Sequence, residues 1–96
     1  MSVNTCIPSG ERVSISVVIP AYNEERTIGE VVRRTKKSGI APIVIDDSSS
    51  DRTFELAKRS GAVVLRHERN RGKGEAIRTG LKYLLGTGGA KNIVII

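Results

Sequence analysis

Three clusters of polar residues in the 96-residue sequence each follow a run of apolar residues. The first cluster, residues 20–25, combines the aromatic ring of Tyr22 with the carboxylate of Glu24. An aromatic ring can lie flat against a base, and a carboxylate can accept hydrogen bonds from a ribose or from base N–H groups. In the alternative interpretation the segment only starts a helix, with Tyr22 covering the sheet edge and Glu24 and Glu25 complementing the helix dipole.

Two adjacent carboxylates, Asp46 and Asp47, open the second cluster. If they end a strand, their side chains point to opposite faces, so only one of them can face a given ligand. One could then recognise a base while the other braces the loop. Such a pair does not converge as a metal site or an acid–base pair requires. The alternative is a turn followed by a helix cap from Ser49, Ser50 or Asp51.

The third cluster, residues 70–75, contains a Gly-Lys-Gly sequence near the expected start of a helix. A P-loop would require Gly at His67 and Ser or Thr at Gly74. A dinucleotide fingerprint beginning at Gly72 would require Gly or Ala at Ile77. The remaining interpretations are a basic loop that contacts a diphosphate and a solvated helix start.

Short apolar strands that alternate with amphipathic helices must position these clusters. The expected strands are residues 13–19, 42–45, 62–65 and 92–96. Pro20 is expected to end the first strand, and Asn23 to cap the first helix, which ends near Gly39. Residues 66–74 are expected to form a loop. The apolar faces of the three helices are expected at Ile28, Val31 and Val32, then Thr53, Leu56, Ala57 and Ser60, then Ile77, Gly80, Leu81, Leu84 and Leu85.

This order of elements predicts an α/β fold, a Rossmann-like three-layer sandwich with a parallel four-stranded sheet and helices on both faces. Ligands of such sheets bind beyond the carboxyl ends of the strands, where the chain changes direction across the sheet. We therefore expect the three clusters to meet at that edge. The single His67 has no nearby Ser or Cys to activate and no metal-ligand spacing, and is interpreted as an ordinary loop residue.

The composition, with a net charge of +6 and 39% hydrophobic residues, indicates one small basic domain. Such a charge suits nucleic acid, an anionic lipid surface or phosphorylated small molecules. Three aromatic residues are too few for the stacking surface of a single-strand binder, so no nucleic acid is expected. Residues 1–12 are expected to be a flexible leader without a signal sequence, and the lone Cys6 fits a reducing cytoplasmic location.

Together and in order, the three clusters resemble the front part of family 2 glycosyltransferases, including dolichol phosphate mannosyltransferases and other polyprenyl-phosphate sugar transferases. The matching segments are residues 17–25 (VVIPAYNEE), 43–53 (IVIDDSSSDRT) and 70–76 (NRGKGEA). The resemblance implies that residues 13–96 form the N-terminal, nucleotide-binding half of a GT-A fold. It also implies that the donor is a nucleoside diphosphate sugar.

The same resemblance assigns roles to individual residues. The residues implied to bind the nucleotide are Pro20, Ala21, Tyr22, Glu24, Asp46, Asp47 and Lys73. Among them, Asp47 would hydrogen-bond the base, Asp46 would support the loop, and Lys73 would face the base or the phosphates. The family usually has Gly after the Asp pair, where this sequence has Ser48.

Members of this family next carry an Asp-x-Asp motif that holds Mg²⁺ or Mn²⁺ against the donor diphosphate. The fourth expected strand ends at Ile96, so the metal ligands and catalytic residues are expected beyond it. This chain alone is then expected to bind no cation and to transfer no sugar. The expected partners are the nucleotide sugar and a lipid-phosphate acceptor at a membrane surface. The alternative is a non-catalytic nucleotide-binding or interaction module that recruits a partner or second copy through an exposed sheet edge.

Overall fold

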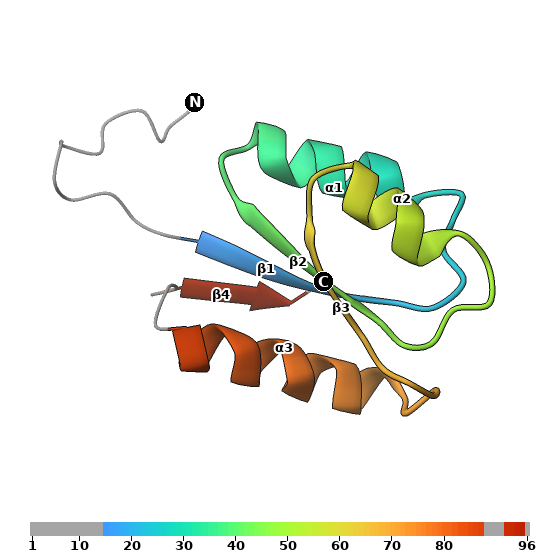
Figure 1. Cartoon of the computed structure of the whole chain (residues 1–96). Helices are drawn as coiled ribbons and strands as arrows, with labels where there is room; N and C mark the ends of the chain where they lie inside the picture. Colours follow the sequence, from blue (N-terminus) through green and yellow to red (C-terminus); the bar gives the residue numbers. More distant parts are fainter. Residues whose placement is uncertain (1–14, 88–91, 96) are drawn as a thin grey trace, which may run out of the picture.

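The computed structural model describes residues 15–87 and 92–95, in which strands and helices alternate (Figure 1). The elements are β1 (Ile15–Ala21), α1 (Ile28–Lys37), β2 (Ala41–Asp46), α2 (Thr53–Arg59), β3 (Val63–Arg66), α3 (Lys73–Thr87) and β4 (Asn92–Ile95). The strands pair in parallel in the order β3-β2-β1-β4. The predicted α/β fold with a parallel four-stranded sheet is confirmed.

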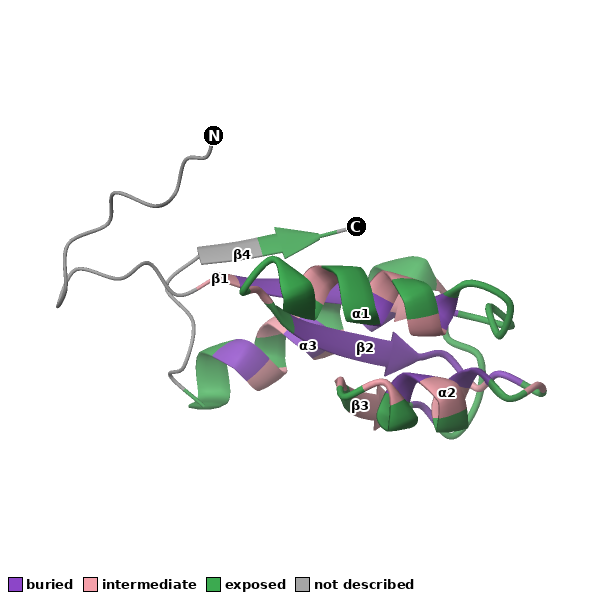
Figure 2. Ribbon diagram, turned by 90° about the horizontal axis from the view of Figure 1, so that it is seen from above, coloured by how far each residue is buried: buried purple, intermediate pink, exposed green. Residues whose placement is uncertain are grey.

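The helices cover the two faces of the sheet unequally. Helices α1 and α2 lie on one face and α3 lies on the other (Figure 1). Alternate residues of the central strands enter different cores, so that Val17 and Val44 pack towards α1 and α2 while Val18 and Ile45 pack towards α3. Figure 2 shows the resulting burial along β2. Burial on both faces explains why these strands are continuous apolar runs rather than alternating ones.

The path of the chain leaves the carboxyl end of β1 open for a ligand. The chain moves outward from β1 through β2 to β3, and α3 then returns it across the opposite face to β4, on the other side of β1. Crevices form beyond the strand ends at such changes of direction. The loops that follow β1, β2 and β3 lie around this end.

Strand β1 extends further than predicted. Pro20 was expected to end it, but Pro20 and Ala21 continue the ladder opposite Ile45 and Asp46. In the described residues, the pairing of β1 with β4 spans Ile15 to Val18, and Pro20, which has no N–H to donate, is paired with Ile45 of β2. The predicted start of the strand at residue 13, the expected leader 1–12 and Ile96 lie outside the described residues.

The prediction that Asn23 caps the first helix is wrong. Helix α1 begins at Ile28 after Thr27, and Glu24 and Glu25 precede it. Asn23 instead has a positive φ of 52°, and its side-chain Oδ1 accepts a hydrogen bond from Ser50 N at 2.9 Å. Asn tolerates this left-handed conformation better than most residues.

Helix α3 begins earlier than predicted, and its buried face agrees with the predicted one at Gly80 and Leu84 only. Lys73 and Gly74 were assigned to the preceding loop but belong to the first turn of the helix. Its buried residues are Ala76, Gly80 and Leu84, whereas Leu85, predicted to be buried, is 73% exposed. Residues four apart therefore face the sheet. In the described ranges, no helix has both the length and the apolar character needed to cross a membrane.

Candidate nucleotide-binding site

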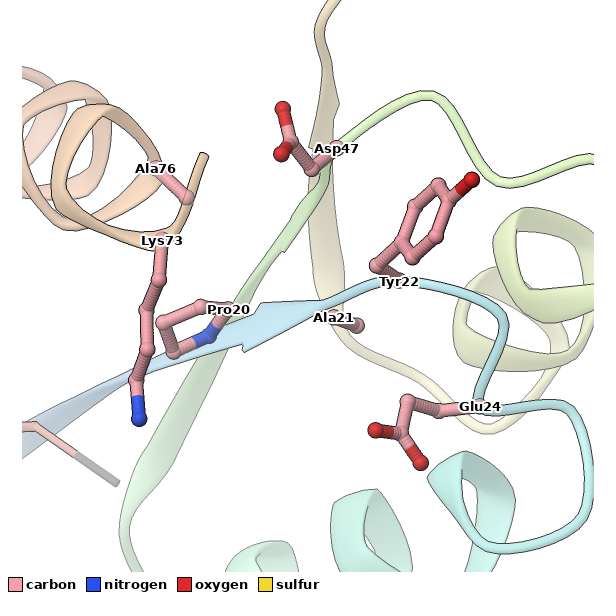
Figure 3. Close-up of a pocket in the computed structure, with 7 residues that line it drawn as sticks. All are labelled: Pro20, Ala21, Tyr22, Glu24, Asp47, Lys73 and Ala76. Atoms are coloured by element: carbon pink, nitrogen blue, oxygen red, sulfur yellow. The ribbon is translucent and has the colours of Figure 1, made fainter. Parts of the chain in front are cut away.

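A pocket of about 210 Å³ lies at the carboxyl end of β1 (Figure 3). It is lined by Pro20, Ala21, Tyr22, Glu24, Asp47, Lys73 and Ala76. These residues come from the end of β1 and the loop after it, the end of β2, and the first turn of α3. The structure thus brings together every predicted nucleotide-binding residue except Asp46, and adds Ala76.

The carboxylate of Asp47 connects the second and third clusters. Its Oδ1 lies 2.7 Å from His67 Nδ1 and accepts a hydrogen bond from Arg71 N at 2.9 Å. Its Oδ2 accepts a hydrogen bond from Gly72 N at 2.8 Å. Gly72 has a φ of 94°, a left-handed conformation that favours glycine. Asp47 is only 4% exposed. Its side chain fixes the loop before α3 at the pocket wall.

These hydrogen bonds also determine the charge of Asp47. Burial alone raises its pKa, but the hydrogen bonds from Arg71 N–H, the His67 ring and Gly72 N–H together outweigh that effect and lower the pKa below its ordinary value. The ionised carboxylate only accepts hydrogen bonds, and it has about four acceptor positions. The three contacts leave about one of them for a ligand.

Asp46 lies outside the pocket, contrary to its inclusion among the nucleotide-binding residues. It is fully buried, its Oδ1 accepts a hydrogen bond from Ser49 N at 3.1 Å, and its Oδ2 lies 3.2 Å from Arg66 Nε in an ion pair. Arg66 also donates from its other nitrogen to the carbonyl of Ser49 at 2.9 Å. Asp46 therefore braces the loop, as its side chain points away from Asp47.

Reciprocal hydrogen bonds join the loop after β1 to the loop after β2, and we call this set the loop clasp. Backbone N–H groups on each side donate to side chains on the other. The donor–acceptor pairs are Asn23 N to Ser49 Oγ (2.8 Å), Glu24 N to Thr53 Oγ1 (2.8 Å), Glu25 N to Asp51 Oδ2 (3.2 Å), Ser50 N to Asn23 Oδ1 (2.9 Å) and Arg52 N to Glu25 Oε1 (3.0 Å). The clasp fixes the backbone from which Tyr22 and Glu24 project.

Thr53 is the most buried member of the clasp, and we expect its hydroxyl to contribute to the stability of the fold. The residue is fully buried, and its Oγ1 contacts both Glu24 N and Asp51 Oδ1. The substitution Thr53→Val keeps the shape but leaves Glu24 N without its acceptor. We expect the free energy of unfolding to fall by about 1–3 kcal/mol, measured by urea denaturation. Thr53→Ser, which keeps the hydroxyl, is the matched control and should lose less; equal losses would contradict this role of the hydroxyl.

The contacts of Ser49, Ser50 and Asp51, each predicted as a possible cap of the second helix, differ from one another. Asp51, one of the three predicted caps, accepts a hydrogen bond from the backbone N of Thr53 at 2.9 Å, at the start of α2. Ser49 and Ser50 bond to Asn23 instead. Ser48 has a positive φ of 67°, a left-handed conformation that glycine, the residue expected here from the family resemblance, adopts more readily.

His67 lies in the loop between β3 and α3, as predicted, but its contacts were missed. The residue is 7% exposed, with Nδ1 at 2.7 Å from Asp47 Oδ1 and Nε2 at 2.7 Å from Thr79 Oγ1 in α3. The register of β2 and β3 could have indicated this. Asp46 pairs with Arg66, so the residues that follow them, Asp47 and His67, are neighbours.

The lowered pKa of Asp47 predicts how stability depends on pH. Because the folded-state pKa lies below the ordinary value of 3.8, the ionised carboxylate stabilises the fold above that pH. This contribution should be lost as the pH falls from 3.8 through the lower folded-state pKa. Urea denaturation at a series of pH values should show a weaker dependence in this range for Asp47→Asn. An unchanged dependence in the variant would rule out Asp47 as its source.

The described residues do not form a site for a divalent cation. No group of three or more His, Cys, Asp or Glu side chains within residues 15–87 and 92–95 is arranged to hold a metal ion. The adjacent carboxylates Asp46 and Asp47 point apart and already have protein partners. No catalytic step through a metal can be assigned to these residues.

Comparison with known proteins relates this chain to one enzyme family. The family model "Glycosyl transferase family 2" matches residues 16–96. An uncharacterised protein of Methanocaldococcus jannaschii is 47% identical over 83 residues, which are 85% of this chain and 34% of that protein. The UDP-N-acetylglucosamine–dolichyl-phosphate N-acetylglucosaminyltransferase of Methanococcus voltae is 35% identical over 92 residues, or 75% of this chain and 37% of that enzyme.

Solved structures indicate the same enzyme family. The glucosyl-3-phosphoglycerate synthase of Mycobacterium tuberculosis, in complex with Mn²⁺, UDP-glucose and phosphoglyceric acid, matches with a TM-score of 0.70 at 33% identity. The match covers 88% of this chain and 32% of that enzyme. Another complex of the same enzyme contains Mg²⁺ and UDP. The chain thus spans about a third of the length of these relatives.

Proposed function

Because the chain belongs to the family 2 glycosyltransferases, we propose that its pocket binds the nucleotide of a nucleoside diphosphate sugar. The observation that carries this proposal is the convergence of Tyr22, Glu24, Asp47 and Lys73 on one pocket, from the loops after β1 and β2 and from the first turn of α3. An aromatic face, two carboxylates and an ammonium group at one place suit a base, a ribose and a phosphate respectively.

Each lining residue has a distinct part in this proposal. Pro20, Ala21 and Tyr22 line the base, and Glu24 accepts hydrogen bonds from the nucleoside. Asp47 accepts a hydrogen bond from an N–H group of the base through its remaining acceptor position. Lys73, at the start of α3, lies where the positive end of the helix dipole adds to its own charge and favours the base carbonyls or the phosphates.

We propose uridine as the nucleoside. The donor of the Methanococcus voltae relative is named as UDP-N-acetylglucosamine, and the related Mycobacterium tuberculosis structure contains UDP-glucose. Uracil presents one imide N–H, which suits the single remaining acceptor position of Asp47. Guanine would present two neighbouring donors, its ring N–H and its amino group, to the same carboxylate.

The complete enzyme is proposed to transfer the sugar to a lipid phosphate, since the name of the Methanococcus voltae relative gives dolichyl phosphate as the acceptor of that enzyme. We propose that it does so at the cytoplasmic face of a membrane. Dolichol phosphate mannosyltransferases are one such group. The Mn²⁺ and Mg²⁺ in the related structures support a divalent cation in the complete enzyme. Residues 13–96 are proposed as its nucleotide-binding half-domain, so that this chain alone binds nucleotide and transfers no sugar.

Calorimetric titration of the chain with UDP and GDP, with and without Mn²⁺, tests this function. We expect binding of UDP in preference to GDP, with little effect of Mn²⁺. Lys73→Ala should weaken the binding several-fold, whereas Lys82→Ala, which removes an exposed charge from the same helix, should not. Failure of both nucleotides to bind would overturn the proposal, and sugar transfer by the chain would overturn its inactivity.

A second candidate is a homo-oligomer that forms through the β4 edge of the sheet. Val94 and Ile95 of this strand are 47% and 45% exposed, and unpaired strand edges can pair with another copy. Size-exclusion chromatography with light scattering would test this, since a monomer at high concentration would contradict edge pairing. The candidate is compatible with nucleotide binding.

A further inference from the structure

A continuous chain of side-chain contacts runs from α3 to the pocket. Thr79 in α3 contacts the Nε2 atom of His67, and the Nδ1 atom of His67 contacts Asp47, each at 2.7 Å. Asp47 lines the pocket and His67 does not. His67 instead lines the neighbouring cavity of about 490 Å³, together with Arg66, Glu68, Arg69 and Arg71. It can therefore act on a pocket ligand only through Asp47.

The partners of His67 define its tautomer. The carboxylate of Asp47 is acceptor-only when ionised, so the hydrogen between it and the ring must reside on Nδ1 of His67. In the neutral ring Nε2 is then an acceptor, and the hydroxyl of Thr79 donates to it. Both ring nitrogens are satisfied, and the ring plane is fixed by α3 on one side and by Asp47 on the other.

The backbone of His67 is fixed as well. Its N–H donates to the carbonyl of Asp46 at 2.9 Å, beyond the last paired residues of β2 and β3. The other two donors to Asp47 are N–H groups of Arg71 and Gly72, and these residues lie in a loop that is mostly exposed. Among the hydrogen bonds of the described residues, those of the buried His67 ring alone connect Asp47 to the middle of a helix.

We propose that His67 is a positioning residue for nucleotide recognition. It holds Oδ1 of Asp47, so that the remaining acceptor position of this carboxylate faces the imide N–H of the base, and Thr79 holds His67. This role rests on the proposed function, because it requires that Asp47 contacts the base. His67 itself touches no part of the nucleotide.

The test compares a nucleotide with its analogue methylated at the imide nitrogen, N3-methyl-UDP, or N1-methyl-GDP if the chain selects GDP. The methyl group removes the hydrogen that Asp47 accepts. The measured quantity is the ratio of the two dissociation constants for the 96-residue chain. Partial unfolding raises the apparent dissociation constants of both ligands by the same factor. A purely structural defect therefore leaves their ratio unchanged.

The wild-type chain should prefer the unmethylated nucleotide by about tenfold, the effect expected for one hydrogen bond to a charged group. For H67A the ratio should fall below about twofold. H67N, which places an amide donor near the position of Nδ1, should retain most of the ratio. T79V should reduce it partly. The control Leu84→Ala, a substitution at a buried residue of the same helix, should lower the melting temperature and leave the ratio intact.

The outcomes separate this inference from the proposed function. If the wild type prefers the unmethylated nucleotide and H67A keeps the full preference, the role of His67 is overturned and nucleotide binding stands. If the wild type binds neither nucleotide, or does not distinguish the methylated one, base recognition by Asp47 fails and the role of His67 fails with it. If H67A does not fold, T79V decides: a reduced preference supports the role of His67, and a full preference overturns it.

Nitrogen-detected NMR of the imidazole provides a readout that needs no ligand. In the chain without nucleotide, the Nδ1 atom of His67 should carry a hydrogen, because it faces the carboxylate of Asp47. T79V should shift the Nε2 resonance, because it removes the hydroxyl that donates to this atom. A ring protonated only at Nε2 would contradict the proposed contact with Asp47.

Discussion

The substitution Asp47→Ala is expected to reduce nucleotide affinity by at least about tenfold, because it removes a hydrogen bond from the base to a charged acceptor. It also removes the acceptor for the N–H groups of Arg71 and Gly72 and for the ring of His67. We therefore expect the free energy of unfolding to fall by about 1–3 kcal/mol. Calorimetric titration with UDP and urea denaturation measure the two effects.

The control for Asp47→Ala is a carboxylate far from the pocket. Glu30 forms an exposed ion pair with Arg34 at 3.2 Å on the surface of α1, and exposed pairs of this kind contribute little. Glu30→Gln should leave both affinity and stability nearly unchanged. If Asp47→Ala bound UDP as tightly as this control, the carboxylate would have no part in recognition.

The largest effect on stability is expected for Gly80→Val. A Cβ atom at Gly80 would lie 2.6 Å from Val18 Cγ1 and 3.1 Å from Val18 Cγ2, and Val18 is fully buried in the sheet. Valine adds two further methyl groups at this contact. Helix α3 would have to move away from the sheet, at an expected loss of about 3 kcal/mol. For a domain of this size the melting temperature should fall by about 10–20 °C.

Gly86 in the same helix provides the matched control. A Cβ atom there would meet nothing within 4 Å. Alanine at this position removes the conformational entropy cost of glycine in a helix, so Gly86→Ala should leave stability unchanged or raise it by up to about 0.5 kcal/mol. Thermal unfolding followed by circular dichroism measures both variants. A Gly80→Val variant as stable as the wild type would show that α3 does not pack closely on Val18.

The order of the elements could be predicted because the signals for it are local. Apolar runs and glycines mark each strand and helix, and the parallel arrangement follows from their alternation. The boundaries depend on distant partners. Pro20 remains in its strand because it pairs with Ile45 of β2, and Leu85 is exposed because the close approach at Gly80 sets which face of α3 meets the sheet.

In the site, too, local signals could be interpreted from the sequence, whereas contacts between distant residues could not. The lining residues Tyr22, Asp47 and Lys73 could be placed near one another because each follows a strand of one parallel sheet. The role of Asn23 could not be predicted, because its partner Ser50 is distant in the sequence, and the contact of His67 with Asp47 becomes evident only once the register of β2 and β3 is known. A side chain that bonds across two loops leaves no periodic or spacing signal.

The residues of the loop clasp that support the pocket are mostly different from the residues that line its surface. Its contacts are made by backbone N–H groups and by the side chains of Asn23, Glu25, Ser49, Asp51 and Thr53, whereas Tyr22 and Lys73 project into the pocket from a frame held by others. Substitutions at Tyr22 and Lys73 can then accumulate with little effect on folding. A fold built in this way can diversify its donor preference during evolution, or in directed selection, without first acquiring compensating mutations.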